Sequence, residues 1–208
     1  MNNTSYRFRL IALSLILLIS TAAGAVESAV TVMQRCADKF ASAAALDISF
    51  SLNSASGPVK GRMLMAGHKF AITSPAMSVW FDGKQQWTYI ARNAEVNLTE
   101  PTPEELVETN PFDVISGFNT RFKCRKLTSP KGKECIELTA KNKNSMISLA
   151  RVDIDSRTGW PVRIFVLFDG GNSTEVTISA IKPVAVPAPS AFRFDKSKYP
   201  GVEIVDLR

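Results

Sequence analysis

From about residue 46 onward, apolar and polar side chains alternate along short runs of the chain. In the first run polar residues separate Ile48, Phe50 and Leu52, a period of two that predicts a β-strand with one buried face. Asp82-Gly83 lies between two apolar, aromatic-rich runs and predicts a tight hairpin, because glycine takes the positive φ that such a turn needs. Further runs lie at 59–66, 70–73, 79–81, 87–89, 95–99, 121–127, 134–141, 146–155, 161–168, 174–181, 192–194 and 202–206. The pattern predicts an α+β fold that is mainly antiparallel β, with a curved sheet around an apolar interior.

Three helical segments interrupt the strands. Residues 27–45 carry apolar side chains at spacings of three and four, which predicts an amphipathic helix. These side chains are Val30, Met33, Ala37, Phe40 and Ala44. At 101–106 and 110–115, a Thr or Asn cap followed by Pro at the first helical position predicts two short helices. We expect both over one opening of the curved sheet.

The run 161–168 differs from the others because both of its faces are apolar. Arg163 is the exception, while Ile164 and Val166 share the other face. A strand exposed to water on one side would alternate, so we expect this strand to be covered on both faces.

The first 25 residues predict a cleaved signal peptide. Arg7 and Arg9 form a positive n-region, residues 10–19 are almost entirely apolar, and Ala23-Gly24-Ala25 is an A-x-A cleavage site. The apolar run is shorter than the roughly 20 residues that a membrane-spanning helix needs. We expect an exported, soluble protein cut after Ala25, with 26–208 as a single domain.

Charge and cysteines narrow the possibilities further. The chain has a formal net charge of +6, and removing Arg7 and Arg9 with residues 1–25 leaves +4. Lys and Arg are scattered, so nucleic acid is not an expected partner.

Cys124 and Cys135 flank the turn-rich segment 129–132 and form a possible disulfide in an oxidising compartment. Cys36, on the first helix, is expected to be a small buried apolar residue.

The sequence contains little that indicates catalysis. His68 is the single histidine and lies beside Gly67 in a predicted turn, so no catalytic triad or zinc site is expected. Asp153 and Asp155 are typical of a solvated strand end, and Glu104-Glu105 is explained by the helix dipole. We expect no enzyme activity, no catalytic residue, no metal and no cofactor.

Large and flexible apolar side chains, by contrast, are abundant on the predicted strands. An ordinary core explains many of them, but a cavity for a lipid chain explains Met63 and Met65 as well, because an unbranched thioether repacks around different ligands. Burying some 14 methylene groups at roughly 0.8 kcal/mol each gives about 11 kcal/mol before the costs of association. That is enough to hold an acyl chain without an ion pair.

An ordered set of motifs resembles one known family. Asp82-Gly83-Lys84 with Trp87 and Tyr89, then Asn110-Pro111-Phe112, then the endings 192–194 and 201–206, resemble LolA, the periplasmic carrier of outer-membrane lipoproteins. The run from Trp80 to Leu106 is most similar to the LolA-like chaperones of Bacteroidetes-type bacteria. The resemblance covers nearly the whole of 26–208.

The resemblance implies an unclosed β half-barrel with a lid of short helices over an apolar cavity. It implies a monomeric periplasmic carrier that takes triacylated lipoproteins from an inner-membrane ABC transporter to the outer membrane or its acceptor. The residues expected to line the lipid-binding cavity are Phe50, Met63, Met65, Phe70, Ile72, Trp87, Tyr89, Ile164 and Val166. Pro111, Phe112 and Ile115 are expected in the lid.

One position departs from the family pattern. Where LolA has a lid-closing arginine just before the aromatic at Phe70, this chain has Ala66-Gly67-His68-Lys69, so Lys69 or Arg62 is the expected latch, or the lid is looser. Two other functions are possible: a half-barrel module that senses lipoprotein or lipid and regulates an envelope partner, and an enzyme acting on a lipid or glycan.

Overall fold

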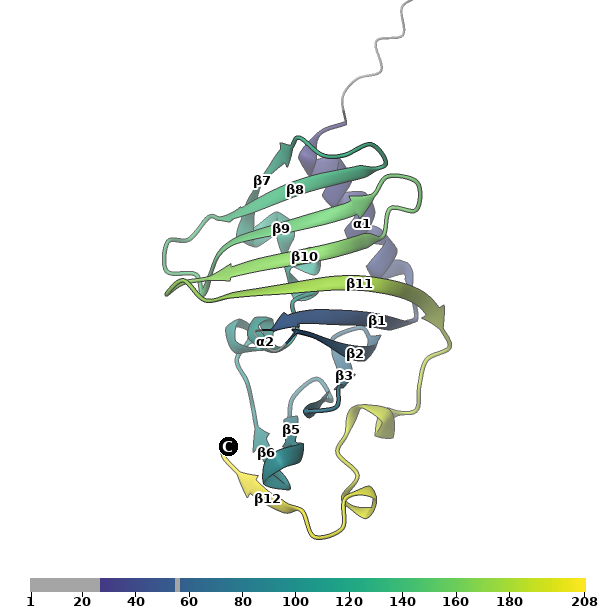
Figure 1. The fold of residues 1–208 in the computed structure, drawn as a ribbon, viewed down its shortest axis with the longest axis vertical. Coiled ribbons are helices and arrows are strands. Elements are labelled where there is room, and N and C mark those ends of the chain that lie inside the picture. Colours follow the sequence, from purple (N-terminus) through teal and green to yellow (C-terminus); the bar gives the residue numbers. More distant parts are fainter. Residues whose placement is uncertain (1–26, 55–56) are drawn as a thin grey trace, which may run out of the picture.

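A single twelve-stranded sheet runs through the computed structural model, which describes residues 27–54 and 57–208. Neighbouring strands are antiparallel, except that β12 pairs with β6 in parallel, and the two ends of the sheet do not meet (Figure 1). The predicted fold is confirmed. The expected signal peptide, residues 1–25, lies outside the part of the chain that is described.

The sheet order is β12-β6-β5-β4-β3-β2-β1-β11-β10-β9-β8-β7, so the first and last thirds of the chain meet at its centre. The strands are β1 (Ala45–Ser54), β2 (Gly57–Ala66), β3 (Lys69–Thr73), β4 (Met77–Phe81), β5 (Gln86–Ile90), β6 (Glu95–Thr99), β7 (Phe122–Leu127), β8 (Lys133–Ala140), β9 (Ile147–Asp155), β10 (Pro161–Phe168), β11 (Ser173–Val184) and β12 (Glu203–Asp206). The helices are α1 (Ala29–Ser42), α2 (Pro103–Thr109), α3 (Asp113–Ser116) and α4 (Phe118–Arg121), with short 3-10 turns η1 (Ala91–Asn93), η2 (Pro189–Phe192) and η3 (Lys196–Lys198).

Helix α1 covers one face of the sheet, which we call the inner face; in Figure 1 it lies behind β7–β11. Ser28 caps the helix by accepting a hydrogen bond from the Thr31 backbone N–H. The buried stripe consists of Val32, Met33 and Cys36. The predicted stripe was therefore partly wrong at its ends, since Val30 and Ala44 are exposed.

The register of the strands separates the inner face from an outer face. Ile48 pairs with Met63, Met63 with Ile72, and Ile72 with Val79, and all four side chains are buried in the inner-face core. Side chains of neighbouring residues point the opposite way. The inner face of the sheet is thus continuously apolar from β1 to β4.

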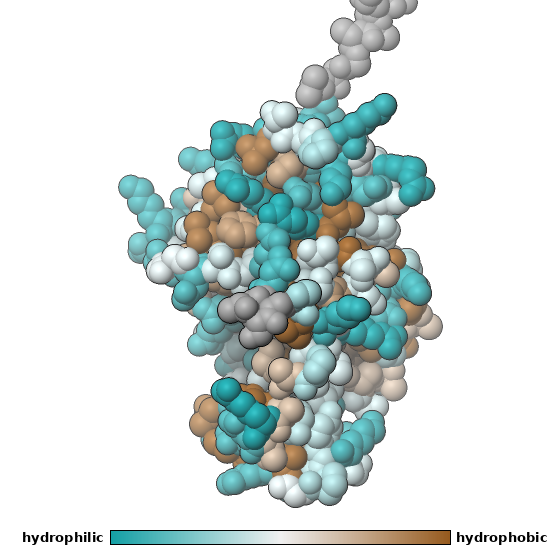
Figure 2. Space-filling model, viewed as in Figure 1, coloured by the Kyte–Doolittle hydropathy of each residue, from teal (hydrophilic) through white to brown (hydrophobic). Residues whose placement is uncertain are grey.

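The outer face of β7–β11 is polar in its middle. Figure 2 shows mainly hydrophilic side chains there, with separate hydrophobic patches. Glu137 is held between Arg125 (2.6 Å) and Arg151 (3.2 Å), and these arginines hold the pKa of its carboxyl below the usual range although burial opposes them. Phe165 and Leu167 of β10 are half-buried on this face. No described element lies in front of β10 in Figure 1. The expectation that β10 is covered on both sides was wrong.

The outer face of β3–β6 has its own cover, the C-terminal segment 185–208. Its Phe194 and Tyr199 contact Trp80 at ring distances of 5.6 and 5.8 Å. Phe192 and Val202 of the same segment are buried. A second, smaller apolar cluster therefore lies on the side of the sheet opposite α1.

The lid begins with a helix that the sequence predicts well. Thr102 accepts a hydrogen bond from the Glu105 backbone N–H, and the Glu105 carboxylate accepts one from the Thr102 backbone N–H, so α2 starts with a capping box. The predicted start of the second lid helix, at residue 110, was too early. Asn110 ends α2 and its side chain accepts from the Phe112 backbone N–H, while α3 begins only at Asp113.

The two cysteines of β7 and β8 are not positioned to bond. Cys124 pairs with Leu138, whereas Cys135 pairs with Leu127. Cys135 is three residues from Leu138 on the same strand, so the two thiols point to opposite faces. Both are free, and the disulfide prediction was wrong. Burial, together with the neighbouring Asp153 carboxylate, raises the pKa of Cys135 to about 12, which leaves little reactive thiolate.

Denatured, unreduced protein is expected to react with a thiol reagent at three cysteines per chain, because register separates Cys124 from Cys135 and Cys36 lies in α1. The count is made by mass spectrometry after alkylation in denaturant. A chain that takes up one label and gains two only after reduction would contradict this register.

Gly61 is expected to tolerate no side chain. A Cβ at position 61 would lie 2.6 Å from Cζ of Phe50, the residue opposite it on β1. Gly61→Ala should therefore destabilise the fold by about 2 kcal/mol, a fall in Tm of roughly 4–8 °C. The same substitution in a Phe50→Leu background should cost clearly less. Equal losses in both backgrounds would contradict the contact.

Candidate functional site

A cavity of about 740 Å³ lies between the inner face of the sheet, α1 and the lid helices α2 and α3. Its apolar lining comes from three parts of the structure. The strands contribute Leu46, Met65, Phe70 and Phe81, and the lid contributes Pro103, Leu106 and Phe112. Helix α1 and the residue after it contribute Ala37, Phe40, Ala41 and Ala43. Gln34, Asp38, His68, Asn110, Asp113 and Ser116 add polar atoms, and Gly67 and Gly83 complete the lining.

The floor of the cavity follows from the alternation of the strands. Met65 on β2 pairs with Phe70 on β3, which pairs with Phe81 on β4. The rings of Phe70 and Phe81 lie 5.4 Å apart. The Asp82-Gly83 hairpin holds this row in place, with Gly83 at a φ of 101°. The Asp82 side chain accepts hydrogen bonds from the Lys84 and Gln85 backbone N–H groups, so the turn is closed from within.

The wall opposite the floor depends on Phe112 of the lid. This side chain is buried, with its ring 6.2 Å from Phe40 of α1 and 6.5 Å from Phe50 of β1. Phe50 can take that position because its ring lies over Gly61. The lid is thus anchored in the core by one aromatic side chain.

The space remains open because α1 presents small side chains to it. Ala37 and Ala41 are one turn apart on the helix, and Ala43 follows its end. Larger side chains at these positions would project into the cavity and reduce its volume. Sequence analysis missed this contribution, although three alanines near one another on an amphipathic helix were the available signal.

The predicted inner-face residues fall into two groups. Met65, Phe70 and Phe112 line the cavity. The others lie in the core around it, with Pro111 half-buried in the lid. The core members are Phe50, Met63, Ile72, Ile115, Ile164 and Val166. That any of them contacts a lipid stays a prediction.

Trp87 and Tyr89 do not belong to this site. Trp87 pairs with Trp80 and Tyr89 with Ser78, so both point to the outer face. The Tyr89 ring lies 4.8 Å from Tyr199 of the C-terminal segment. Their assignment to the cavity was wrong, because alternation shows which residues share a face but not which face α1 covers.

The lid is held by an arginine that the sequence did not indicate. Arg121 of α4 donates hydrogen bonds to the backbone carbonyl of Asp113 and, at 2.7 Å, to its carboxylate. Gly117 permits this, because a Cβ there would lie 2.2 Å from Nε of Arg121. Arg62 cannot act as the latch, since it points to the outer face and binds Asp47. Lys69 is exposed and also points outward from β3.

The arrangement offers few groups for covalent chemistry. Asp153 is bound to Arg163, and the Asp155 carboxylate accepts hydrogen bonds from Thr158. Burial raises the pKa of the Cys36 thiol to about 12, so it is not a nucleophile. Over 27–54 and 57–208, no three His, Cys, Asp or Glu side chains are grouped so that they could hold a metal ion. The chemistry available is burial of apolar surface.

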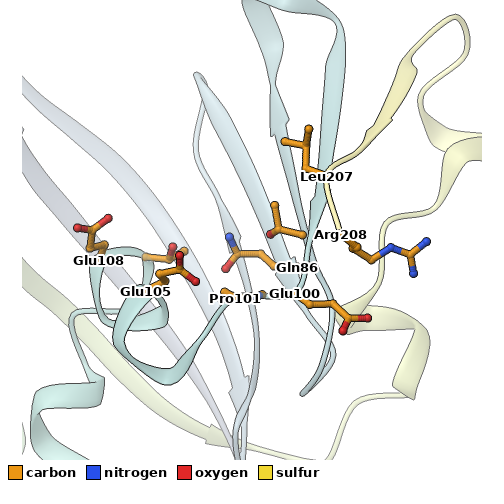
Figure 3. A pocket seen from close by; sticks show the side chains of 9 residues that line it. Gln86, Glu100, Pro101, Glu105, Glu108, Leu207 and Arg208 are labelled. Atoms are coloured by element: carbon orange, nitrogen blue, oxygen red, sulfur yellow. The ribbon is translucent and has the colours of Figure 1, made fainter.

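A second pocket, of about 480 Å³, has a different character (Figure 3). Glu105 and Glu108 of α2 lie on one side, the C-terminal Leu207 and Arg208 lie on the other, and Gln86 lies between them. Its polar and charged lining is unsuited to an acyl chain. We therefore take the 740 Å³ cavity as the candidate site.

An unclosed antiparallel sheet with a helical lid over an apolar cavity is the architecture expected of LolA-like proteins. The model of the family described as "Outer membrane lipoprotein carrier protein LolA" matches residues 19–169, and the chain belongs to this family. None of the helices described here is both long and apolar enough to cross a membrane.

Individual relatives are distant. Outer-membrane lipoprotein carrier proteins of Bordetella pertussis and Bordetella bronchiseptica are each 28% identical over 127 residues, which cover 61% of this chain and 58% of theirs. The match thus spans little more than half of the relatives' length. An uncharacterized conserved protein from Thermus thermophilus shares the fold, with a TM-score of 0.54 at 8% identity over 84% of this chain and 96% of that chain.

Arg121→Ala is expected to loosen the lid. Loss of its hydrogen bonds to Asp113 should raise amide hydrogen exchange in 113–121 about tenfold, because a hydrogen bond to a charged group contributes roughly 1.5 kcal/mol. Arg62→Ala, which breaks an ion pair on the outer face, is the matched control and should leave lid exchange unchanged. Faster lid exchange in the Arg62 variant alone would show that the latch lies there instead.

Proposed function

We propose that this protein carries lipoproteins by enclosing their acyl chains in the apolar cavity beneath the lid. The observation that supports this most directly is the 740 Å³ space between Met65, Phe70 and Phe112, whose floor and walls are apolar. Burying 14 methylene groups there contributes about 11 kcal/mol before the costs of association. The family and the names of the two Bordetella relatives support the same ligand class.

The proposed route follows from the family. After removal of residues 1–25, residues 26–208 act as one monomeric domain in the periplasm. The protein accepts triacylated lipoproteins from an inner-membrane ABC transporter and releases them at the outer membrane or its acceptor. Membership of the carrier family supports this route.

The protein acts by binding rather than by catalysis in this proposal. Asp153 and Asp155, which the sequence assigns to a solvated strand end, lie away from the cavity lining and are held by Arg163 and Thr158. His68 does line the cavity, but it is exposed at its edge. Uptake and release then depend on movement of α2 and α3.

Met65→Glu is expected to remove acyl-chain binding. Met65 is half-buried on the cavity floor, so a carboxylate there would lie against the bound acyl chain. Water can still reach the carboxylate in the folded protein, so the fold should tolerate it. Wild-type protein isolated from periplasm without detergent should carry triacylated peptides in near-stoichiometric amount, measured by mass spectrometry. The variant should carry less than a tenth of that amount.

Thr73→Glu is the matched control, because Thr73 is exposed on the outer face of the neighbouring strand. It should retain the full load, and Phe70→Glu should lose it if that variant folds. Equal loads in the Met65 and Thr73 variants would refute the cavity assignment. If the wild-type protein is free of ligand and copurifies with an envelope signalling protein, the result would favour the sensing module over the carrier function.

A further inference from the structure

The volume of the cavity limits how much of a lipid it encloses with the lid closed. Taking about 30 Å³ per methylene, the volume share of a water molecule, 740 Å³ holds roughly 25 methylene groups. One chain of about 16 carbons fits with room for the atoms that join it to its head, whereas three such chains need roughly twice the volume. The closed form is therefore sized for one chain.

The charged side chains that line the cavity are carboxylates. Asp38 comes from α1 and Asp113 from the start of α3, and His68 is the basic side chain among the lining residues described. Gln34 donates a hydrogen bond to Asp38 at 2.8 Å but carries no charge, so the charge of Asp38 is not neutralised by that contact. Asp113 is paired with Arg121, so Asp38 supplies the unneutralised negative charge that a ligand head meets at this site.

The cations on the neighbouring elements are directed elsewhere. Lys39 of α1 donates to the Thr158 carbonyl at 2.6 Å and lies over the Trp160 ring. Arg35, on the same helix, binds Glu27 and Glu134, and Arg121 is bound to Asp113. Lys69 points outward from β3, with its aliphatic part near Gly83. Lys39, Arg35 and Arg121 are thus already engaged and are not free to pair with an anionic head in the cavity mouth.

We propose, resting on the function proposed above, that the closed cavity holds one linear acyl or alkyl chain. It prefers a chain whose head is cationic or uncharged to one with a carboxylate or sulfate head. The single chain follows from the volume, and the head preference follows from Asp38, because Asp113 is already paired with Arg121. A whole triacylated ligand then enters only when α2 and α3 move away from Phe40 and Phe50.

Matched sixteen-carbon probes, of which the cavity has room for one but not two, test this proposal: hexadecyltrimethylammonium, the uncharged hexadecyl maltoside and hexadecyl sulfate, each titrated below its micelle concentration. Calorimetry and native mass spectrometry give affinity and stoichiometry. We expect one chain per protein, with the ammonium probe bound about three- to fivefold more tightly than the sulfate, the size of one charge pair near a surface. Non-specific attraction to a protein of positive net charge would give the opposite order.

Asp38→Asn should bring the ammonium-to-sulfate ratio close to one while stoichiometry stays at one. Asp169→Asn, an exposed carboxylate in the β10–β11 turn, is the matched control and should not change the ratio. Tighter binding of sulfate, or two or more chains per protein with unchanged lid exchange, would overturn the proposal. If no probe binds but triacylated peptides copurify, the one-chain proposal falls and the carrier function stands. If neither binds, both fall.

Discussion

The burial of one apolar sheet face by helices, without a second sheet, is the constraint on which the rest of this structure depends. A helix layer covers a curved face incompletely, and here α1 presents Ala37 and Ala41 where larger side chains would close the gap. Phe112 then fixes the lid by packing between Phe40 and Phe50. Because Phe50 needs a glycine opposite it, the position of the lid depends on a residue without a side chain, Gly61.

The outer face of β7–β11 stays uncovered because charges occupy it. Carboxylates lie low in the surface and guanidinium groups stand above them: the Glu137 side chain is 7% exposed and that of Arg125 71%. Arg151 pairs with Phe165 in register, so its aliphatic part can cover apolar surface while its head stays in water. A second sheet packed on this face would strip water from these groups at a high cost.

Much of the fold could be predicted from local pattern, because alternation and turn residues act over a few residues. The Asp82-Gly83 hairpin, the Thr102 cap and the strand runs are of this kind. The errors arose where contacts between segments far apart in the sequence determine the structure. Trp87 and Tyr89 follow the predicted alternation. The segment 185–208, however, packs on their face of the sheet and forms a second core there. Cys124 and Cys135 flank one turn, and a register offset of three residues separates them. Arg121 can hold the lid because Gly117 leaves room for its side chain, and no periodic pattern in the sequence marks that glycine.

The central pairing of β1 with β11 has a consequence for the newly made chain. Ile48 is paired with Ile181, so the middle of the sheet joins residues more than 130 positions apart. Contacts of such long range are slow to form, since loop closure comes before any gain from packing. Until β11 is available, β1 has an unpaired edge and the inner face has no closed core. The topology therefore leaves the sheet incomplete at its centre until residues 173–184 have been made.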